Sequence, residues 1–364
     1  MMPRDGAGGQ VRRLALVMIA SVGYVVQIGK VVPVEAQEPA AIRPHPAAPV
    51  EAPASAAGQQ TAPSVVEHAD VSGQEVTRTY LIGPIDLPAH TPHQHHAPFV
   101  PNGVSAEAVP WYFHSQVPVV AVPVGEDGWL VEFAARILDE REQELPGTLL
   151  CHTALFRFDA QHPASSEVVA GSGGELSSTV LPAGYGVPVF KGQPLQMMSL
   201  FRNPLPEDFK SVYLKVAVRF VARAQGHAPL TSVKPVWLSA HQPSQPEDAS
   251  YLVMPGREVK TSRVTFPFPG MVVYLMGHLH APYGVRLLLA NATTGKTVWN
   301  AEARKSPDGR AITLPQWSQR DNFRVAPTES YELSAEYQNT SNQPIDAMGV
   351  VGAFVVPDES RDES

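Results

Sequence analysis

Cysteine is nearly absent from the chain, since Cys151 is the only one among 364 residues. No disulfide can form within the chain, so packing alone must stabilise its cores. Charged side chains are also scarce, at 17% of the residues with a net charge of −8, and no stretch is rich in lysine or arginine. Because binding to nucleic acid requires clustered cations, we expect no nucleic-acid partner.

Long apolar runs are missing beyond the N-terminal region. Arg12 and Arg13 precede an apolar stretch over about residues 14–28, and residues 34–36 supply the small side chains at which a signal peptidase cleaves. We therefore expect residues 1–36 to be a signal peptide, and the mature protein to be periplasmic or secreted without a membrane span. An uncleaved anchor is the alternative, but the stretch is shorter than the roughly 20 residues that a spanning helix needs.

Alanine and proline dominate residues 37–66. Such a segment buries too little apolar surface to offset the entropy lost on ordering, so we expect a disordered linker over residues 37–75. A second irregular segment, residues 90–101, carries four histidines among prolines: His90, His93, His95 and His96. Without a fixed backbone they would hold a metal ion only loosely, and we favour a solvated loop.

Proline and glycine, at 36 and 27 residues, are too frequent for a helical bundle, because proline removes a helix donor and glycine costs backbone entropy. Short runs rich in Val, Leu, Phe and Tyr alternate with turn residues, which is typical of strands. The expected strands are residues 149–158, 212–221, 271–280, 285–289 and 350–356. Residues 129–138 fit either a strand or a helix.

Strands at such spacing indicate an all-β protein made of β-sandwiches. Residues 222–249 are rich in Pro, Gln and Ser and lack periodicity, so we place a domain boundary there. We expect an N-terminal β-sandwich domain over residues 76–230 and a C-terminal one over residues 231–357. Residues 358–364 are expected to form a disordered tail.

His278 and His280 close a strongly apolar strand. Residues two apart in a strand point to the same side, so both imidazoles are expected to face one point. Two neutral imidazoles on a rigid strand can grip a metal ion, but a complete site needs another ligand. The alternative is a pair of surface or hydrogen-bonded histidines without metal.

Met348 is the candidate third ligand, just ahead of the last apolar strand. Its thioether is a soft donor that favours copper, particularly Cu(I), over zinc or magnesium. Two imidazoles and a thioether therefore indicate copper. The alternative is that Met348 fills space in the core, as methionine commonly does.

Four segments of the C-terminal half carry a resemblance: Gly-His-Leu-His at 277–280, Gly-Val-Arg-Leu at 284–287, Tyr-Glu-Leu-Ser-Ala-Glu-Tyr-Gln-Asn-Thr at 331–340 and Asp-Ala-Met-Gly at 346–349. Together they resemble the C-terminal domain of the copper type II, ascorbate-dependent monooxygenases, which include the peptidylglycine and dopamine hydroxylases. In that family a His-x-His pair and a distant methionine hold the copper at which oxygen is activated. The matching residues are His278, His280 and Met348.

This resemblance covers about residues 265–356. It implies a pair of antiparallel, jelly-roll-like β-sandwich domains, a copper cofactor, and O2 and a small reductant as partners. The activity that it implies is that of an oxidoreductase, a copper-dependent monooxygenase.

The N-terminal half resembles the family less. Family members hold a second, electron-transferring copper with two adjacent histidines on one strand and a third on another strand. Cys151 and His152 stand in place of the adjacent pair, so only His152 carries over, and residues 212–221 contain no histidine. A weak second site of His152 and Cys151, with Met197 or Met198, would suit Cu(I), because thiolate and thioether are soft. We favour the alternative of a small buried cysteine and a hydrogen-bonded core histidine.

Functions of different classes stay open. Hydroxylation of the family type needs two electrons per oxygen molecule, and a chain with one copper lacks the usual source of the second. The first hypothesis is a copper protein that activates oxygen, and the second is a non-catalytic exported protein for copper storage, delivery or protein contact. A third keeps the sandwich without metal, as an interaction module. The sequence contains no motif of a serine hydrolase, a phosphate loop or a zinc protease.

Overall fold

Strands make up about 65% of the structure, and nearly all of its regular secondary structure. The structure is a computed structural model, and it describes residues 63–91, 115, 117–157, 167–176, 178–223, 228–241, 250–280, 283–307, 312–318 and 323–358. Within these residues the one helical element is a short 3-10 helix at Gly147–Leu149, and all strand pairs but one are antiparallel. The prediction of an all-β fold is confirmed.

Several predictions concern residues outside the described part of the chain. They are the signal peptide over residues 1–36, the linker up to residue 62, the loop histidines His93, His95 and His96, and the tail after residue 358. Among the residues that are described, no helix is long and apolar enough to cross a membrane.

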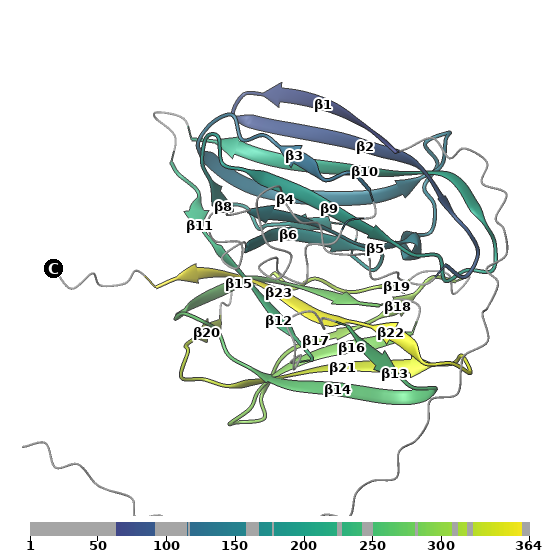
Figure 1. Ribbon diagram of the computed structural model, residues 1–364. Helices are drawn as coiled ribbons and strands as arrows, with labels where there is room; N and C mark the ends of the chain where they lie inside the picture. Colours follow the sequence, from purple (N-terminus) through teal and green to yellow (C-terminus); the bar gives the residue numbers. More distant parts are fainter. Residues whose placement is uncertain are drawn as a thin grey trace, which may run out of the picture. The chain divides into compact units, whose positions relative to one another are not determined.

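Two sheets form the N-terminal β-sandwich (Figure 1). The strands of the first are β1 (Ser64–Ser72), β2 (Glu75–Leu87), β4 (Gly128–Leu138), β7 (Ser178–Val180), β8 (Tyr185–Val189), β10 (Phe209–Ala222) and β11 (Thr231–Ser232). They are ordered β1-β2-β10-β4-β8-β11, and β7 pairs with β4. The strands of the second are β3 (Val120–Val122), β5 (Leu150–Arg157), β6 (Glu167–Gly173) and β9 (Leu195–Phe201), in the order β3-β9-β5-β6.

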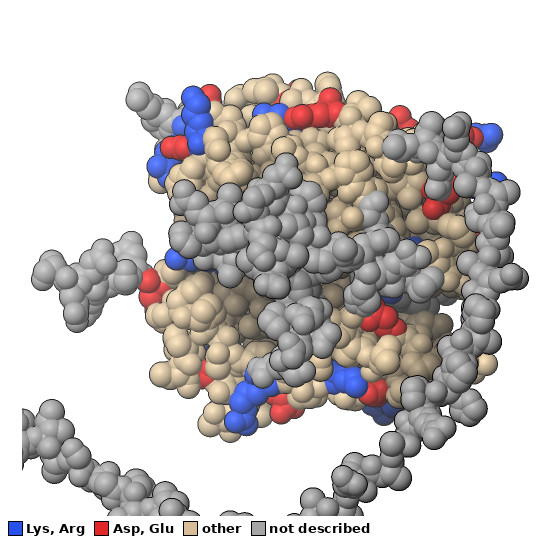
Figure 2. Space-filling model, in the orientation of Figure 1, with Lys and Arg blue, Asp and Glu red and all other residues tan. Residues whose placement is uncertain are grey.

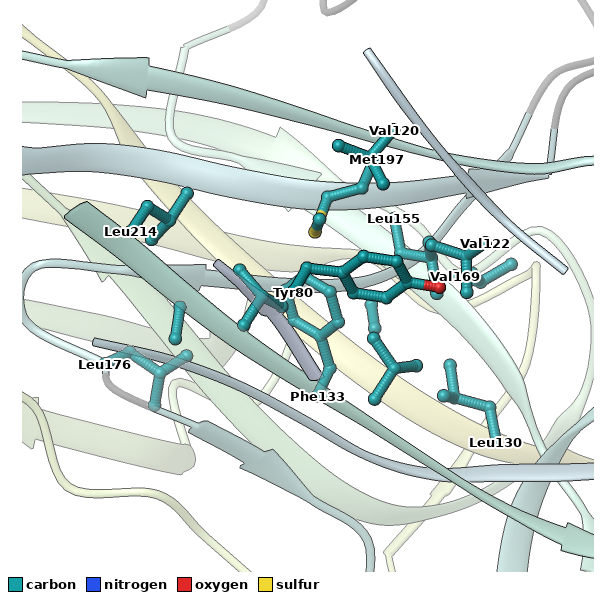
Figure 3. Close-up of a cluster of buried hydrophobic side chains, with 14 of the residues drawn as sticks. Tyr80, Val120, Val122, Leu130, Phe133, Leu155, Val169, Leu176, Met197 and Leu214 are labelled. Carbon is teal, nitrogen blue, oxygen red and sulfur yellow. The ribbon is translucent and has the colours of Figure 1, made fainter. Parts of the chain in front are cut away.

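Apolar side chains at alternate positions fill the space between these two sheets. In β10, Leu214 and every second residue after it up to Phe220 are buried, while the residues between them are partly exposed. Figure 3 shows Tyr80 and Phe133 of the first sheet gathered with Leu155 and Met197 of the second. Residues 129–138, which fitted a strand or a helix equally, therefore belong to strand β4 because its alternate side chains complete this core.

β1 lies within the residues predicted to be linker. It pairs with β2 along its whole length, through a turn in which Gly73 has a φ of +61°, a value that favours glycine. All of its side chains are exposed, so backbone hydrogen bonds to β2 order this strand, rather than burial. Residues 64–72 also contain three valines and no proline. The prediction of a disordered linker over residues 37–75 is therefore wrong from Ser64 onward.

Two further four-stranded sheets form the C-terminal β-sandwich. The first is built of β12 (Lys234–Ser239), β15 (Gly270–Leu279), β20 (Phe323–Val325) and β23 (Gly349–Pro357), in the order β12-β23-β15-β20. The second is built of β14 (Gly256–Val264), β16 (Gly284–Asn291), β17 (Thr297–Glu302) and β21 (Tyr331–Asn339), in the order β14-β21-β16-β17. Two short pairs complete it: β13 (Tyr251–Val253) with β22 (Ile345–Ala347), and β18 (Arg304–Lys305) with β19 (Ile312–Thr313).

The sheet that contains β15 is buried on both faces. One face carries Leu275 and Val351 into the C-terminal core. The other face carries Tyr274, Met276 and Phe354 into the core of the N-terminal sandwich. A strand covered on both sides gains from apolar residues at every position, which explains why β15 is a continuous apolar run.

Side-chain hydrogen bonds also join the two sandwiches. The indole Nε1 of Trp237 on β12 donates to the backbone oxygen of Val168 on β6 (2.8 Å). Gln316 joins both sides, because its Nε2 donates to the Ser178 carbonyl (2.6 Å) and its Oε1 accepts from the Tyr274 hydroxyl (2.7 Å). Residues 58–364 accordingly form one compact unit.

The exposed surface carries mixed charge. On the face drawn in Figure 2, lysine, arginine, aspartate and glutamate are scattered singly or in small groups among uncharged residues. Ion pairs such as Arg78 with Glu67 (2.6 Å) join opposite charges on neighbouring strands. Exposed pairs of this kind add little to stability, so the buried contacts dominate.

We predict that the two sandwiches unfold together. Changing Phe354, a fully buried residue of β23 in the N-terminal core, to alanine should lower the free energy of unfolding by about 3–5 kcal/mol. Urea unfolding followed by tryptophan fluorescence and by circular dichroism should give one coincident transition before and after the change. Leu252→Ala is the control, since Leu252 is 61% exposed and should shift stability by about 0.5 kcal/mol or less. Two separate transitions would contradict the shared core.

Candidate metal centre

His278 and His280 lie together at the end of β15. Their ring centroids are 5.1 Å apart with the ring planes at 78°, so both imidazoles are on one side of the strand, as the spacing predicts. They continue the face of Met276, which the N-terminal sandwich covers. As a result both side chains are buried, with 9% of His278 and 1% of His280 exposed.

Met348 lies opposite His280 on the neighbouring chain segment. The register of β15 and β23 pairs these two positions, and the His280 N–H donates to the Met348 carbonyl (3.2 Å). A Cβ on Gly349 would meet the hydroxyls of Tyr251 (2.9 Å) and Tyr337 (3.2 Å), which belong to the C-terminal core. Because neighbouring side chains alternate along a strand, we infer that Met348 is directed to the other face, that of the two imidazoles.

Glu175, which the sequence analysis missed, fixes one of these imidazoles. Its Oε1 is 2.5 Å from Nδ1 of His278, and its side chain is fully buried. A carboxylate only accepts hydrogen bonds, so Nδ1 carries a proton, and in the neutral imidazole Nε2 then presents a lone pair. That Nε2 is buried and has no hydrogen-bond partner in the structure, and the same holds for Oε2 of Glu175.

His280 has the same orientation of its two ring nitrogens. Its Nδ1 is 3.2 Å from the backbone oxygen of Asp346, an acceptor, so the proton again belongs on Nδ1. Its Nε2 is 3.5 Å from the sulfur of Cys151. His280 therefore turns its Nε2 toward Cys151 in the contact between the sandwiches, and Nε2 of His278 is buried.

Cys151 and His152 enter the same contact from β5. Adjacent residues in a regular strand point to opposite faces, but the pairing of β5 with β9 shifts register between Leu150 and His152, which marks a β-bulge. The sulfur of Cys151 is 3.5 Å from Nδ1 of His152 and also reaches His280. The His152 and His278 ring centroids are 5.6 Å apart. The two sites predicted separately from the sequence are thus neighbours in one cluster.

The two methionines of β9 differ in position. Met197 lies opposite Leu155, and both belong to the core of the N-terminal sandwich. The suggestion that Met197 completes a site with His152 is therefore wrong, because its side chain lies on the other face of the sheet. Met198 lies opposite Ala154, on the same face as His152.

Burial and a nearby positive charge act in opposite directions on the pKa of the Cys151 thiol. Burial raises the pKa of the Cys151 thiol to about 12, although the nearby Arg202 guanidinium acts in the opposite direction. Arg202 is itself buried, and its Nε and Nη2 have no hydrogen-bond partner in the structure. The cysteine is therefore a neutral thiol at neutral pH, and only a strong positive charge such as a metal ion would deprotonate it.

The contacts in this cluster are pairwise. Among the residues that the structure describes, no three His, Cys, Asp or Glu side chains are grouped as a ready metal site. An ion shared by His278, His280 and Met348 would therefore have to draw these side chains together. The donor types suit such an ion: imidazole nitrogens with their protons on the far side, as in metal sites whose histidines donate to a carboxylate or a backbone carbonyl.

A cavity of about 280 Å³ adjoins Glu175. Its walls come from both sandwiches, and include Arg136, Glu144 and Gly173 on one side and Leu314 and Gln316 on the other. The cavity is large enough for small molecules, and it lies beside the Glu175 carboxylate that contacts His278.

Comparison with known proteins identifies no family. No family model and no curated protein matches the chain. The structure of the Macrobrachium rosenbergii nodavirus aligns with 88% of this chain and 99% of its own, at 11% identity and a TM-score of 0.19. Dimeric latent PorU from Porphyromonas gingivalis aligns with 64% of this chain and 24% of its own, at 9% identity and a TM-score of 0.19. Alignments this weak carry no argument about fold or function.

We predict that Gly173 cannot be enlarged without disturbing the cluster. A Cβ there would lie 2.6 Å from Oε1 of Glu175 and 2.9 Å from Nδ1 of His278. Gly173→Ala should therefore cost about 1–3 kcal/mol of stability through overpacking and should shift the NMR signals of His278. Gly125→Ala is the matched control, because a Cβ at Gly125 has no neighbour within 4 Å. Equal stability of the two variants, measured by urea unfolding, would argue against the close packing described above.

Proposed function

We propose that this protein is an exported copper-binding protein whose ion is held by His278, His280 and Met348. The observation that carries the proposal is the state of His278: Nδ1 is fixed by a buried carboxylate, and Nε2 is buried without a hydrogen-bond partner. An unsatisfied buried nitrogen costs about 1–3 kcal/mol, so the chain gains if an ion occupies that lone pair.

The donor set supports copper over other metals. A thioether is soft and adds little to a zinc or magnesium site, whereas copper, particularly Cu(I), accepts it together with imidazoles. Glu175 and the Asp346 carbonyl would hold the two rings in the orientation that directs Nε2 to the ion. The resemblance of residues 265–356 to the ascorbate-dependent copper monooxygenases leads to the same three ligands.

Activation of oxygen at this ion is the second candidate function. The observation that favours it is the cavity beside Glu175, which has room for O2 and a small reductant next to the cluster. Copper would supply one-electron redox chemistry there. The residues of the chain would position the ion and limit the access of water, since the three ligands are buried.

We predict that the purified protein binds about one copper ion tightly. Titration with Cu(I) against a competing chelator should show one site, which His278→Ala abolishes. Met348→Leu should keep the fold, since the two side chains have similar volumes, and weaken binding at least about tenfold. Matched controls are His68→Ala on exposed β1 and Met254→Leu, where Met254 is 56% exposed. A folded protein that binds no copper in this assay would end the proposal.

Copper bound by the histidine-rich loop needs a separate control. A variant with His93, His95 and His96 changed to alanine should keep the tight site, because such a loop competes poorly with a chelator. Loss of the tight site in this variant, with His278→Ala unaffected, would move the proposed site to the loop.

Oxygen consumption separates the two candidate functions. With ascorbate as reductant, a protein that activates oxygen should consume it faster than the same amount of free copper, and His278→Ala should remove the excess. A storage or delivery protein should consume none beyond free copper. The second result would remove the oxygen-activating candidate and leave copper binding in place.

A further inference from the structure

Cys151 is not one of the three proposed ligands, but it contacts one of them, His280. It comes from β5 of the N-terminal sandwich, whereas His278 and His280 come from β15 of the C-terminal one. The β-bulge between Leu150 and His152 turns it toward His280, and its side chain is fully buried. A regular strand would not bring both Cys151 and His152 to this side.

The distance between Cys151 and His280 suits a shared ion. A tetrahedral ion bound at about 2.0 Å to an imidazole nitrogen and about 2.3 Å to a thiolate sulfur separates these two atoms by about 3.5 Å. The sulfur of Cys151 and Nε2 of His280 are 3.5 Å apart. A neutral thiol that donates a hydrogen bond to Nε2 would give a similar distance, so a second observation has to decide.

That second observation is again His278. Its Nε2 lies in the same cluster, is buried, and has no hydrogen-bond partner, whereas a hydrogen bond between Cys151 and His280 would satisfy only His280. An ion would satisfy both imidazoles at once.

We propose that Cys151 is a thiolate ligand of the same ion, which makes one site of two imidazoles, a thiolate and a thioether that spans both sandwiches. The inference rests on the proposed copper site and deepens it. On binding, the thiol gives its proton to solvent and its sulfur bonds to the metal. Two histidines and a cysteine with a weak methionine are the ligands of electron-transfer copper sites.

These four protein ligands would complete the coordination of the copper ion. They indicate electron transfer as its role. The ion would accept one electron from a small reductant such as ascorbate, passing from Cu(II) to Cu(I), and would return it to a one-electron acceptor. No ligand changes its protonation in that cycle. With four protein ligands in place, no position is left open for oxygen, so this inference favours copper binding with electron transfer over the oxygen-activating candidate.

Spectroscopy of the metal-loaded full chain tests the proposal. Cu(II) added without oxygen should give an intense visible thiolate-to-copper absorption band, and Co(II), which does not oxidise thiols, should give the corresponding near-ultraviolet band. Cys151→Ser and Cys151→Ala should each lose both bands and bind Cu(I) at least about tenfold more weakly. His152→Ala should keep both bands, which separates the thiolate from its neighbour. X-ray absorption at the copper edge of the unchanged protein needs no variant and should show a short copper–sulfur bond.

Each outcome decides the matter. One tightly bound copper without a thiolate band, and with equal affinity in Cys151→Ala, would overturn the thiolate ligand and leave the His278, His280 and Met348 site standing. No copper bound by the unchanged, folded protein would remove both proposals.

Discussion

The burial of one sheet on both faces is the constraint on which the rest of the structure depends. Because the sheet of β12, β23, β15 and β20 packs against two cores, the apolar side chains of β15 from Met271 to Leu279 pack into one core or the other. His278 and His280 end that strand, and so their imidazoles are buried against the N-terminal sandwich instead of facing water. A single sandwich would have left the same pair on its surface.

Burial on this scale makes each polar atom of the cluster costly. Glu175 and His278 lower that cost by pairing at 2.5 Å, and Asp346 and Cys151 do the same for His280. Replacing such a network by apolar residues often stabilises a protein, so retaining it requires a reason beyond stability. Two buried atoms without a hydrogen-bond partner, Nε2 of His278 and Oε2 of Glu175, lie together in this cluster, which is where a ligand would act.

Much of this arrangement could be predicted from the sequence, because local rules govern it. The two-residue period of a strand placed His278 and His280 on one side, and the apolar runs located β5, β10, β15, β16 and β23 to within a few residues. Glu175 was missed because its role depends on contact with a strand about a hundred residues away, although a lone carboxylate after an apolar, glycine-rich run was a signal. The bulge at Cys151 and the pairing of β1 depend on register between strands, which no local pattern contains.

The same geometry bears on how many copper ions the proposed site would hold. A separate electron-transferring copper would need its own ligands at a distance from the first, yet Cys151 reaches His280 at 3.5 Å and the rings of His152 and His278 are 5.6 Å apart. Met197 is committed to the N-terminal core, and residues 212–221 of β10 supply no histidine. Because these donor side chains are few and lie close together, they favour one shared copper ion over two separate ones. In the proposed site Cys151 would then be a further ligand of the same ion, a thiolate suited to passing electrons.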